Sequence, residues 1–277
     1  MQIGFIQNLI DKIRGKEHIP YVSITSKKIA GADKFCKKID TLILGSSHME
    51  MGYIATKKEY NLATSSQDLY YSYNLLKKYN NDNIKNVILS ISYFSTWHVL
   101  IKTREYAIYC AYFKILTGID YQYNNVAKEK NLYYIEEKYG DYLKKYYKRF
   151  LSGNYRGNYN KYQKGYHVPS DEKKNSILKA MNREHSQMYI FEKFLEETKD
   201  KNVYIVIPPM SKDFQEFMPD KQTIFGKTYD IVKSYGNVKL LDYYDDNDFK
   251  QDDFFDFQHL NLKGAKKFTN KIKSNFN

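Results

Sequence analysis

Short apolar runs that end at turn residues are the feature that most restricts how this chain can fold. Each run is four or five residues long and rich in aliphatic or β-branched side chains, and helical patterns separate most of them. Runs of this kind are typical of strands that are buried on both faces of a parallel sheet. The candidate strands are residues 41–44, 60–63, 87–91, 203–207 and 238–241.

Helical periodicity between the candidate strands predicts an α/β fold. Residues 69–79 have helical spacing, and the last helix carries Leu262, Ala265, Phe268 and Ile272 on one face. Strands that alternate with helices are typical of βαβ units, which build parallel sheets with helices on both faces. We therefore expect a flavodoxin-like three-layer α/β/α architecture with a mainly parallel five-stranded sheet.

A long segment interrupts this alternation between the third and fourth candidate strands. More than 100 residues separate 87–91 from 203–207, whereas a βαβ unit needs only about 30 residues in all. Residues 97–197 are rich in tyrosine and lysine and mostly helical in pattern. We expect residues 1–277 to form a single α/β domain in which 97–197 is a helical insertion or lid.

The net charge of +12 comes mainly from lysine and does not indicate sequence-specific binding of nucleic acid. Only five of the 44 basic residues are arginines, and arginine is the usual residue for reading bases and for paired hydrogen bonds to phosphate. Coding bias in an AT-rich genome also produces an excess of Lys, Asn, Tyr and Ile. We expect no specific nucleic-acid partner, while an anionic substrate stays open.

Cysteine content and apolar run lengths bear on the compartment. Cys36 and Cys110 are too few for a disulfide framework and lack metal-site spacing. No apolar run approaches the roughly 18 residues of a membrane span, and residues 1–14 lack the pattern of a signal peptide. We expect a cytoplasmic protein without a transmembrane segment or a bound metal, with association to the cell envelope and the oligomeric state left open.

The first candidate for chemistry is Gly45-Ser46-Ser47-His48, directly after the first candidate strand. Ligands of parallel α/β sheets bind beyond the carboxyl ends of the strands, so a serine at this point is well placed to react. Serine and glycine are also ordinary turn and helix-cap residues. The tetrapeptide alone is therefore a weak indication of function.

The second candidate is Asp256-Phe257-Gln258-His259, just before the last helix. A serine nucleophile needs a base within hydrogen-bond reach and a carboxylate that fixes the tautomer of that base. A spacing of three residues allows Asp256 and His259 to approach the same site from one turn. A helix N-terminal acid with a nearby surface histidine is the alternative interpretation.

Together the two segments resemble the SGNH (GDSL-like) hydrolase and acyltransferase superfamily. That superfamily has a Gly-Asp-Ser block after its first strand and an Asp-x-x-His block before its last helix, in the order found here. Serine in place of the aspartate is similar to branches that acylate cell-envelope polymers, including the proteins of alginate acetylation and of teichoic-acid D-alanylation. The resemblance covers the sheet elements and leaves the insertion uncovered.

The resemblance implies a catalytic triad and an oxyanion hole. Ser47 would be the nucleophile, with Ser46 as the alternative, His259 the general base and Asp256 its orienting carboxylate. The backbone N–H groups of Ser47 and Ser66 would hold the oxyanion, although Ser66 stands where the superfamily has glycine.

The third block of the superfamily carries an asparagine, which this chain lacks in the stretch 90–94. Either a hydroxyl of Ser92 or Tyr93 takes its place, or the oxyanion hole has one donor fewer. His48, Ser92 and Tyr93 are therefore candidates for contact with substrate.

The function that the resemblance implies is a serine-dependent transfer or cleavage of an O-acyl group, most simply acetyl. The expected substrate is a carbohydrate, such as a surface or capsular polysaccharide or its precursor. No cofactor is expected, apart from an acyl donor such as acetyl-CoA. Two alternatives stay open: a general ester or lipid hydrolase of the same superfamily, and an inactive relative that binds glycans or proteins.

Overall fold

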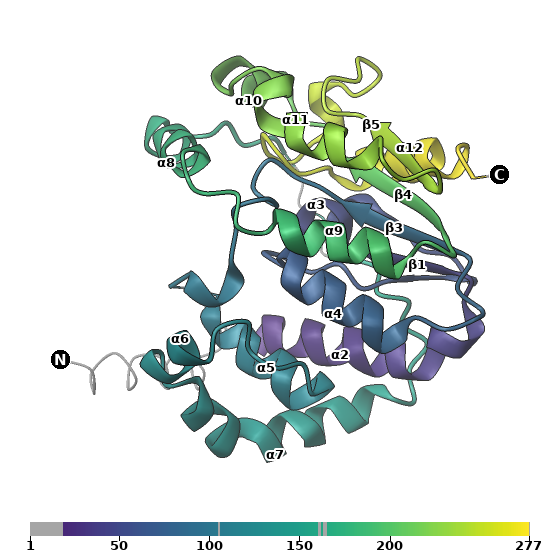
Figure 1. Cartoon of the computed structure of the whole chain (residues 1–277), viewed down its shortest axis with the longest axis vertical. Helices are drawn as coiled ribbons and strands as arrows, with labels where there is room; N and C mark the ends of the chain where they lie inside the picture. Colours follow the sequence, from purple (N-terminus) through teal and green to yellow (C-terminus); the bar gives the residue numbers. More distant parts are fainter. Residues whose placement is uncertain (1–18, 105, 160–161, 163–164, 277) are drawn as a thin grey trace. The chain divides into compact units, whose positions relative to one another are not determined.

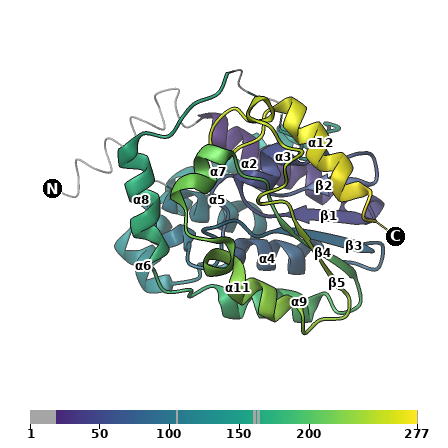
Figure 2. The ribbon, with the colours of Figure 1, turned by 90° about the horizontal axis from the view of Figure 1, so that it is seen from above.

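The computed structural model (Figures 1 and 2) describes residues 19–104, 106–159, 162 and 165–276, with only the backbone described for 19–24. The chain divides into two compact units, each made of two stretches of sequence. One unit comprises Met1–Lys34 and Ile101–Tyr155, and the other comprises Phe35–Leu100 and Arg156–Asn277. All of the strands and both sequence blocks singled out above belong to the second unit.

A five-stranded parallel sheet is the centre of the second unit. Its strands lie in the order β2-β1-β3-β4-β5, and every neighbouring pair is parallel. The α/β fold with a parallel five-stranded sheet is therefore confirmed, and no strand boundary differs from the predicted one by more than two residues. The strands are β1 (Thr41–Leu44), β2 (Glu59–Asn61), β3 (Asn86–Ser90), β4 (Asn202–Ile207) and β5 (Val238–Asp242).

Pairing of β1 with β3 fixes the edge at which the site forms. Leu42 lies opposite Val87 and Leu44 opposite Leu89, and all residues of β1 are buried. Because the two strands run in the same direction, the residues that follow them emerge at the same edge of the sheet. The Ser46-Ser47 segment and the 91–94 segment are thereby brought together.

Helices cover both faces of the sheet and complete the three predicted layers. The helices α4 and α9 lie together on one face, while α3 and α12 lie together on the other, as Figure 2 shows. The α-helices that lie wholly in this unit are α3 (Ser47–Gly52), α4 (Leu69–Tyr79), α8 (Asp171–Met181), α9 (Met188–Glu197), α10 (Lys212–Phe217), α11 (Lys221–Val232) and α12 (Leu262–Lys273). Short 3-10 turns occur at η1 (Cys36–Lys38), η2 (Leu100–Lys102), which spans the boundary between the units, and η3 (Gln251–Asp253).

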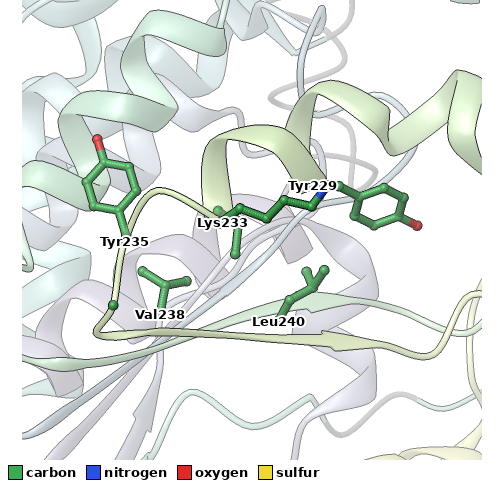
Figure 3. Close-up of a pocket in the computed structure, with 7 residues that line it drawn as sticks. Tyr229, Lys233, Tyr235, Val238 and Leu240 are labelled. Carbon is green, nitrogen blue, oxygen red and sulfur yellow. The ribbon is translucent and has the colours of Figure 1, made fainter.

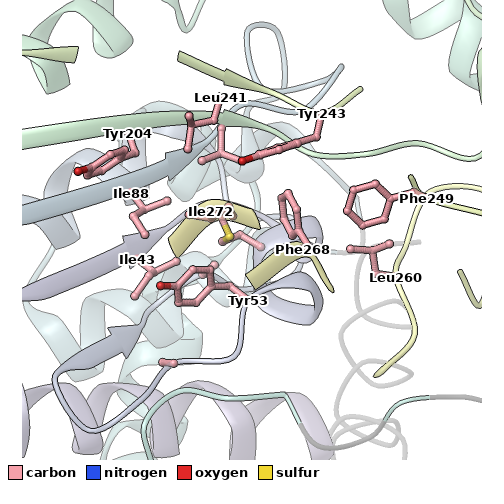
Figure 4. Close-up of a cluster of buried hydrophobic side chains, with 14 of the residues drawn as sticks. Ile43, Tyr53, Ile88, Tyr204, Leu241, Tyr243, Phe249, Leu260, Phe268 and Ile272 are labelled. Carbon is pink, nitrogen blue, oxygen red and sulfur yellow. The ribbon is translucent and has the colours of Figure 1, made fainter. Parts of the chain in front are cut away.

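The last helix packs its apolar face against the sheet, as its periodicity predicts. Phe268 and Ile272 are fully buried in a cluster with Tyr53 and strand residues such as Ile43 and Ile88 (Figure 4). Burial of one such side chain contributes about 1.5–3 kcal/mol. This packing joins the C-terminal segment, which carries Asp256 and His259, to the helix that carries Ser47.

The first unit is helical. It contains most of α2 (Ile19–Phe35), with α5 (Ala107–Thr117), α6 (Asn124–Glu129) and α7 (Leu132–Phe150), and α7 packs against both α5 and α6. The long stretch between β3 and β4 is thus helical as predicted, and the single-domain description stays a prediction. None of the helices in the described ranges has both the length and the apolarity that crossing a membrane requires.

Candidate active site

The turn between β1 and α3 presents Ser47 at the carboxyl edge of the sheet. Gly45 has φ of +136°, and a Cβ at this position would lie 2.1 Å from Ser90 Oγ, so the turn accepts only glycine. Ser46 is extended and is the N-cap of α3, and Ser47 is the first helical residue. A first helical residue has no partner for its N–H within the helix.

A tight turn folds the ring of His259 back onto Asp256. The Asp256 carboxylate accepts hydrogen bonds from the backbone N–H groups of Gln258 at 2.9 Å and His259 at 2.8 Å. The same carboxylate lies 2.9 Å from Nδ1 of His259. Aspartate is suited to this turn because its short side chain reaches the backbone two and three residues ahead.

The structure brings Ser47, His259 and Asp256 together in the order that the sequence predicts. His259 Nε2 lies 2.9 Å from Ser47 Oγ, while His259 Nδ1 faces Asp256. Ser47 is 9% exposed. These contacts form a continuous chain of hydrogen bonds from hydroxyl to imidazole to carboxylate, which is the arrangement of a serine nucleophile with its base and orienting group.

The surroundings of Asp256 favour its ionised form. Burial acts to raise the pKa of this carboxyl, but the hydrogen bond and charge of His259 and the two backbone N–H groups outweigh burial and lower it. An ionised Asp256 holds the proton of His259 on Nδ1. The Nε2 atom is then free to accept a proton from Ser47.

Ser66 has the backbone geometry that the missing glycine would supply. Its φ is +60°, in the left-handed region, within the turn that joins β2 to α4. Among the described residues, none accepts a hydrogen bond from the N–H of Ser66 or of Ser47. Both groups are therefore available as donors, and their role as an oxyanion hole stays a prediction.

Two side chains that the sequence did not single out hold the Ser66 turn. Glu50, on the helix that carries Ser47, accepts from the N–H of Ser65 at 2.8 Å and from its hydroxyl at 2.7 Å. His98 donates from Nε2 to the carbonyl of Ser66 at 2.9 Å. The glutamate is three residues after the nucleophile, but no sequence pattern indicates its partner across the turn.

His48, Ser92 and Tyr93 are buried, with exposed fractions of 3%, 1% and 8%. His48 Nδ1 lies 2.7 Å from Ser92 Oγ. The Tyr93 hydroxyl donates to Gln258 at 3.2 Å, and burial raises its pKa, so it stays a neutral donor. These side chains contact the protein itself, and contact with substrate stays a prediction for all three.

In the described part of the chain, neither a metal-binding cluster nor the pocket between α11 and β5 involves the triad. Within the described ranges, no three His, Cys, Asp or Glu side chains lie close enough together to hold a metal ion. A pocket of about 440 Å³ lies between α11 and β5, with Tyr229, Lys233, Tyr235, Val238 and Leu240 in its lining (Figure 3). None of the triad residues lines it.

No protein-family model matches the chain, and no curated protein matches its sequence. Among solved structures, a chain from Streptococcus pneumonia, provisionally described as a platelet activating factor, is similar over 98% of both chains, with a TM-score of 0.47 and 12% sequence identity.

Replacing Ser66 tests whether its backbone or its side chain matters. We expect Ser66→Gly to keep activity on a model ester and to change stability by less than about 1 kcal/mol, because relief of strain offsets the entropy that glycine adds to the unfolded chain. Ser66→Val should lose about 1–3 kcal/mol, since a β-branched residue is poorly tolerated at this φ. Urea unfolding and ester cleavage measure both effects. A stable but inactive Ser66→Gly would show that the Ser66 hydroxyl acts in the site.

Proposed function

We propose that this protein catalyses acyl transfer or ester cleavage with Ser47 as the nucleophile. The observation that carries the proposal is the hydrogen-bond chain from Ser47 Oγ to His259 Nε2 and from His259 Nδ1 to Asp256. A serine hydroxyl is a weak nucleophile by itself, and an adjacent base held in one tautomer activates it.

The reaction proceeds in two halves on these residues. Ser47 Oγ attacks the acyl carbonyl, and its proton passes to His259 Nε2 while Asp256 stabilises the imidazolium. The N–H groups of Ser47 and Ser66 hold the negative charge on the carbonyl oxygen. His259 then protonates the leaving oxygen as its bond to the acyl carbon breaks. In the second half, His259 takes the proton of the water or acceptor hydroxyl that attacks the acyl carbon, and it returns this proton to Ser47 Oγ as the bond between the acyl group and Ser47 breaks.

Ser47 is favoured over Ser46 because the two hydroxyls have different partners. Ser46 is 2% exposed, and its hydroxyl lies 3.3 Å from both Ser92 Oγ and His48 Nδ1. The hydroxyl of Ser47 faces His259 Nε2. Only Ser47 therefore has both a base and a carboxylate in line.

We further propose that the acceptor or substrate is a carbohydrate. The resemblance of the serine block to envelope-acylating branches supports this choice. Exposed tyrosines, whose rings stack on sugars and whose hydroxyls bond to them, are consistent with it. One of them is Tyr189 on α9, in the unit that carries the triad. The alternatives are a general ester hydrolase and an inactive relative. The Ser47→Ala assay tests for an inactive relative, and the acceptor assay tests for a hydrolase.

Removal of the Ser47 hydroxyl should abolish ester cleavage. We expect Ser47→Ala to lower the kcat for p-nitrophenyl acetate by at least about 10³-fold, because the nucleophile is lost while the fold is kept. Ser46→Ala is the matched control and should lose less than about tenfold, since its hydroxyl contacts His48 and Ser92 and does not face His259. Release of p-nitrophenol measures both rates. Equal activity of wild type and Ser47→Ala would refute the assignment.

An acceptor experiment separates transfer from hydrolysis. Adding an oligosaccharide acceptor to the wild type with the same ester should increase ester consumption and yield an acylated oligosaccharide, because a bound hydroxyl competes with water for the acyl group on Ser47. Mass spectrometry of the oligosaccharide detects the product. Free acid as the sole product across a broad panel of glycans would identify an esterase instead.

A further inference from the structure

His48 touches the proposed base directly. It follows Ser47 in the sequence, on the same helix, and its ring stacks on that of His259 with centroids 5.1 Å apart and planes 25° apart. His259 also stacks on Phe255, at 5.5 Å and 10°. The ring that must face both Ser47 and Asp256 is therefore in contact with rings from two different segments.

Two hydroxyls hold His48 through one nitrogen. Its Nδ1 lies 2.7 Å from Ser92 Oγ and 3.3 Å from Ser46 Oγ, and these two oxygens are 3.3 Å apart. Ser92 is itself fixed, because its N–H donates to Ser95 Oγ at 2.9 Å. The network joins the ends of β1 and β3 to the proposed base.

The other ring nitrogen of His48 indicates which tautomer is present. Nε2 is buried and has no hydrogen-bond partner among the described residues. A buried N–H without an acceptor is rare and costly, and a bare lone pair is tolerated more often. The proton therefore belongs on Nδ1, where it is donated to Ser92, and the Ser92 hydroxyl is free to donate to Ser46.

His48 stays neutral beside a base that becomes charged. Burial lowers its pKa well below the usual value for histidine, the charge of His259 lowers it further, and Asp256 acts in the opposite direction. Among the described residues, three titratable groups face His48. They are His259, Asp256 and Tyr93, and the Tyr93 ring meets His48 edge-on with ring centroids 6.3 Å apart. A positive charge on His48 at this distance would repel the positive charge of a protonated His259 and destabilise it.

We propose that His48 is a positioning residue, a ring locked by Ser92 and Ser46 that holds the plane of His259 between Ser47 and Asp256. This inference rests on the proposed function of the triad. Ser47 and His48 are adjacent residues of α3. The same helix therefore carries the proposed nucleophile and the ring that supports the proposed base. His48 acts through His259 and makes no contact with the reacting atoms.

Three variants separate the ring from its hydrogen bond. His48→Phe keeps a ring to stack on His259, His48→Asn keeps a polar group near the Nδ1 position without the ring, and Ser92→Ala removes the partner of Nδ1. His185→Phe is the matched control, because His185 Nδ1 also lies 2.7 Å from a hydroxyl, that of Thr96, and no ring contact with the triad involves it.

We expect His48→Asn to lower the kcat for p-nitrophenyl acetate about 10- to 100-fold with little change in KM, because a misplaced base slows the chemical step and leaves binding intact. His48→Phe should keep more activity than His48→Asn, and Ser92→Ala should fall between wild type and His48→Asn. His185→Phe should match wild type. Because a loss of folded protein would also lower the apparent kcat at constant KM, each rate is divided by the folded fraction, which circular dichroism measures.

Nitrogen NMR of the histidine rings tests the tautomer directly. His48 should show a neutral ring with its proton on Nδ1 at pH 6.5, where an ordinary histidine is half protonated. The pH dependence of stability should also report the lowered pKa of His48. In the unfolded chain His48 takes up a proton below its usual pKa of about 6.5, and in the folded chain it stays neutral there. The wild type should therefore lose thermal stability more steeply than His48→Phe as the pH falls below 6.5.

The outcomes distinguish this proposal from the one on which it rests. A wild type no more active than Ser47→Ala overturns both. An active wild type whose kcat is unchanged in His48→Asn, or a His48 ring that carries its proton on Nε2 or titrates near pH 6.5, overturns the positioning role alone.

Discussion

Parallel pairing of β1 with β3 is the constraint on which the site depends. The pairing ends both strands at one edge, so the Ser46-Ser47 turn and the Ser92 segment meet there. The turn can follow β1 so tightly because Gly45 has no side chain to collide with Ser90. His259 comes from the far end of the chain and is held in place by the packing of α12 against the sheet and α3. Strand register and helix packing thus bring together groups that are 212 positions apart in sequence.

Buried polar contacts then fix the site more finely than apolar packing can. Glu50 joins the helix that carries Ser47 to the turn of Ser66, and His98 holds the other side of that turn. His48 connects the ends of two strands to the ring of His259. Each of these groups would be costly to bury without its partners, so each restricts the backbone around it. A site held in this way would need little reorganisation during the proposed reaction. Preorganised polar groups of this kind are the main source of electrostatic catalysis.

Much of the fold was predictable because apolar runs and helical spacing report burial directly. The parallel sheet, its five strands and the terminal helix follow from those patterns, as does the local turn that joins Asp256 to His259. Other features depend on contacts distant in sequence. β2 ends at Asn61, whose side-chain amide donates hydrogen bonds to the carbonyls of Met49 and Tyr53. No local sequence pattern indicates these contacts. Glu50 and His98 were missed for the same reason. Local sequence patterns do not show which residue a side chain contacts in a distant segment.

We propose that Ser47 carries the acyl group between donor and acceptor. Mass spectrometry of wild-type protein quenched during turnover of p-nitrophenyl acetate tests it most directly. We expect one acetyl group on the peptide that contains Ser47, located on the Ser47 hydroxyl, and no acetyl group on that peptide in Ser47→Ala. Product formation with an acetyl group on a different residue, or with equal labelling in Ser47→Ala, would contradict the account.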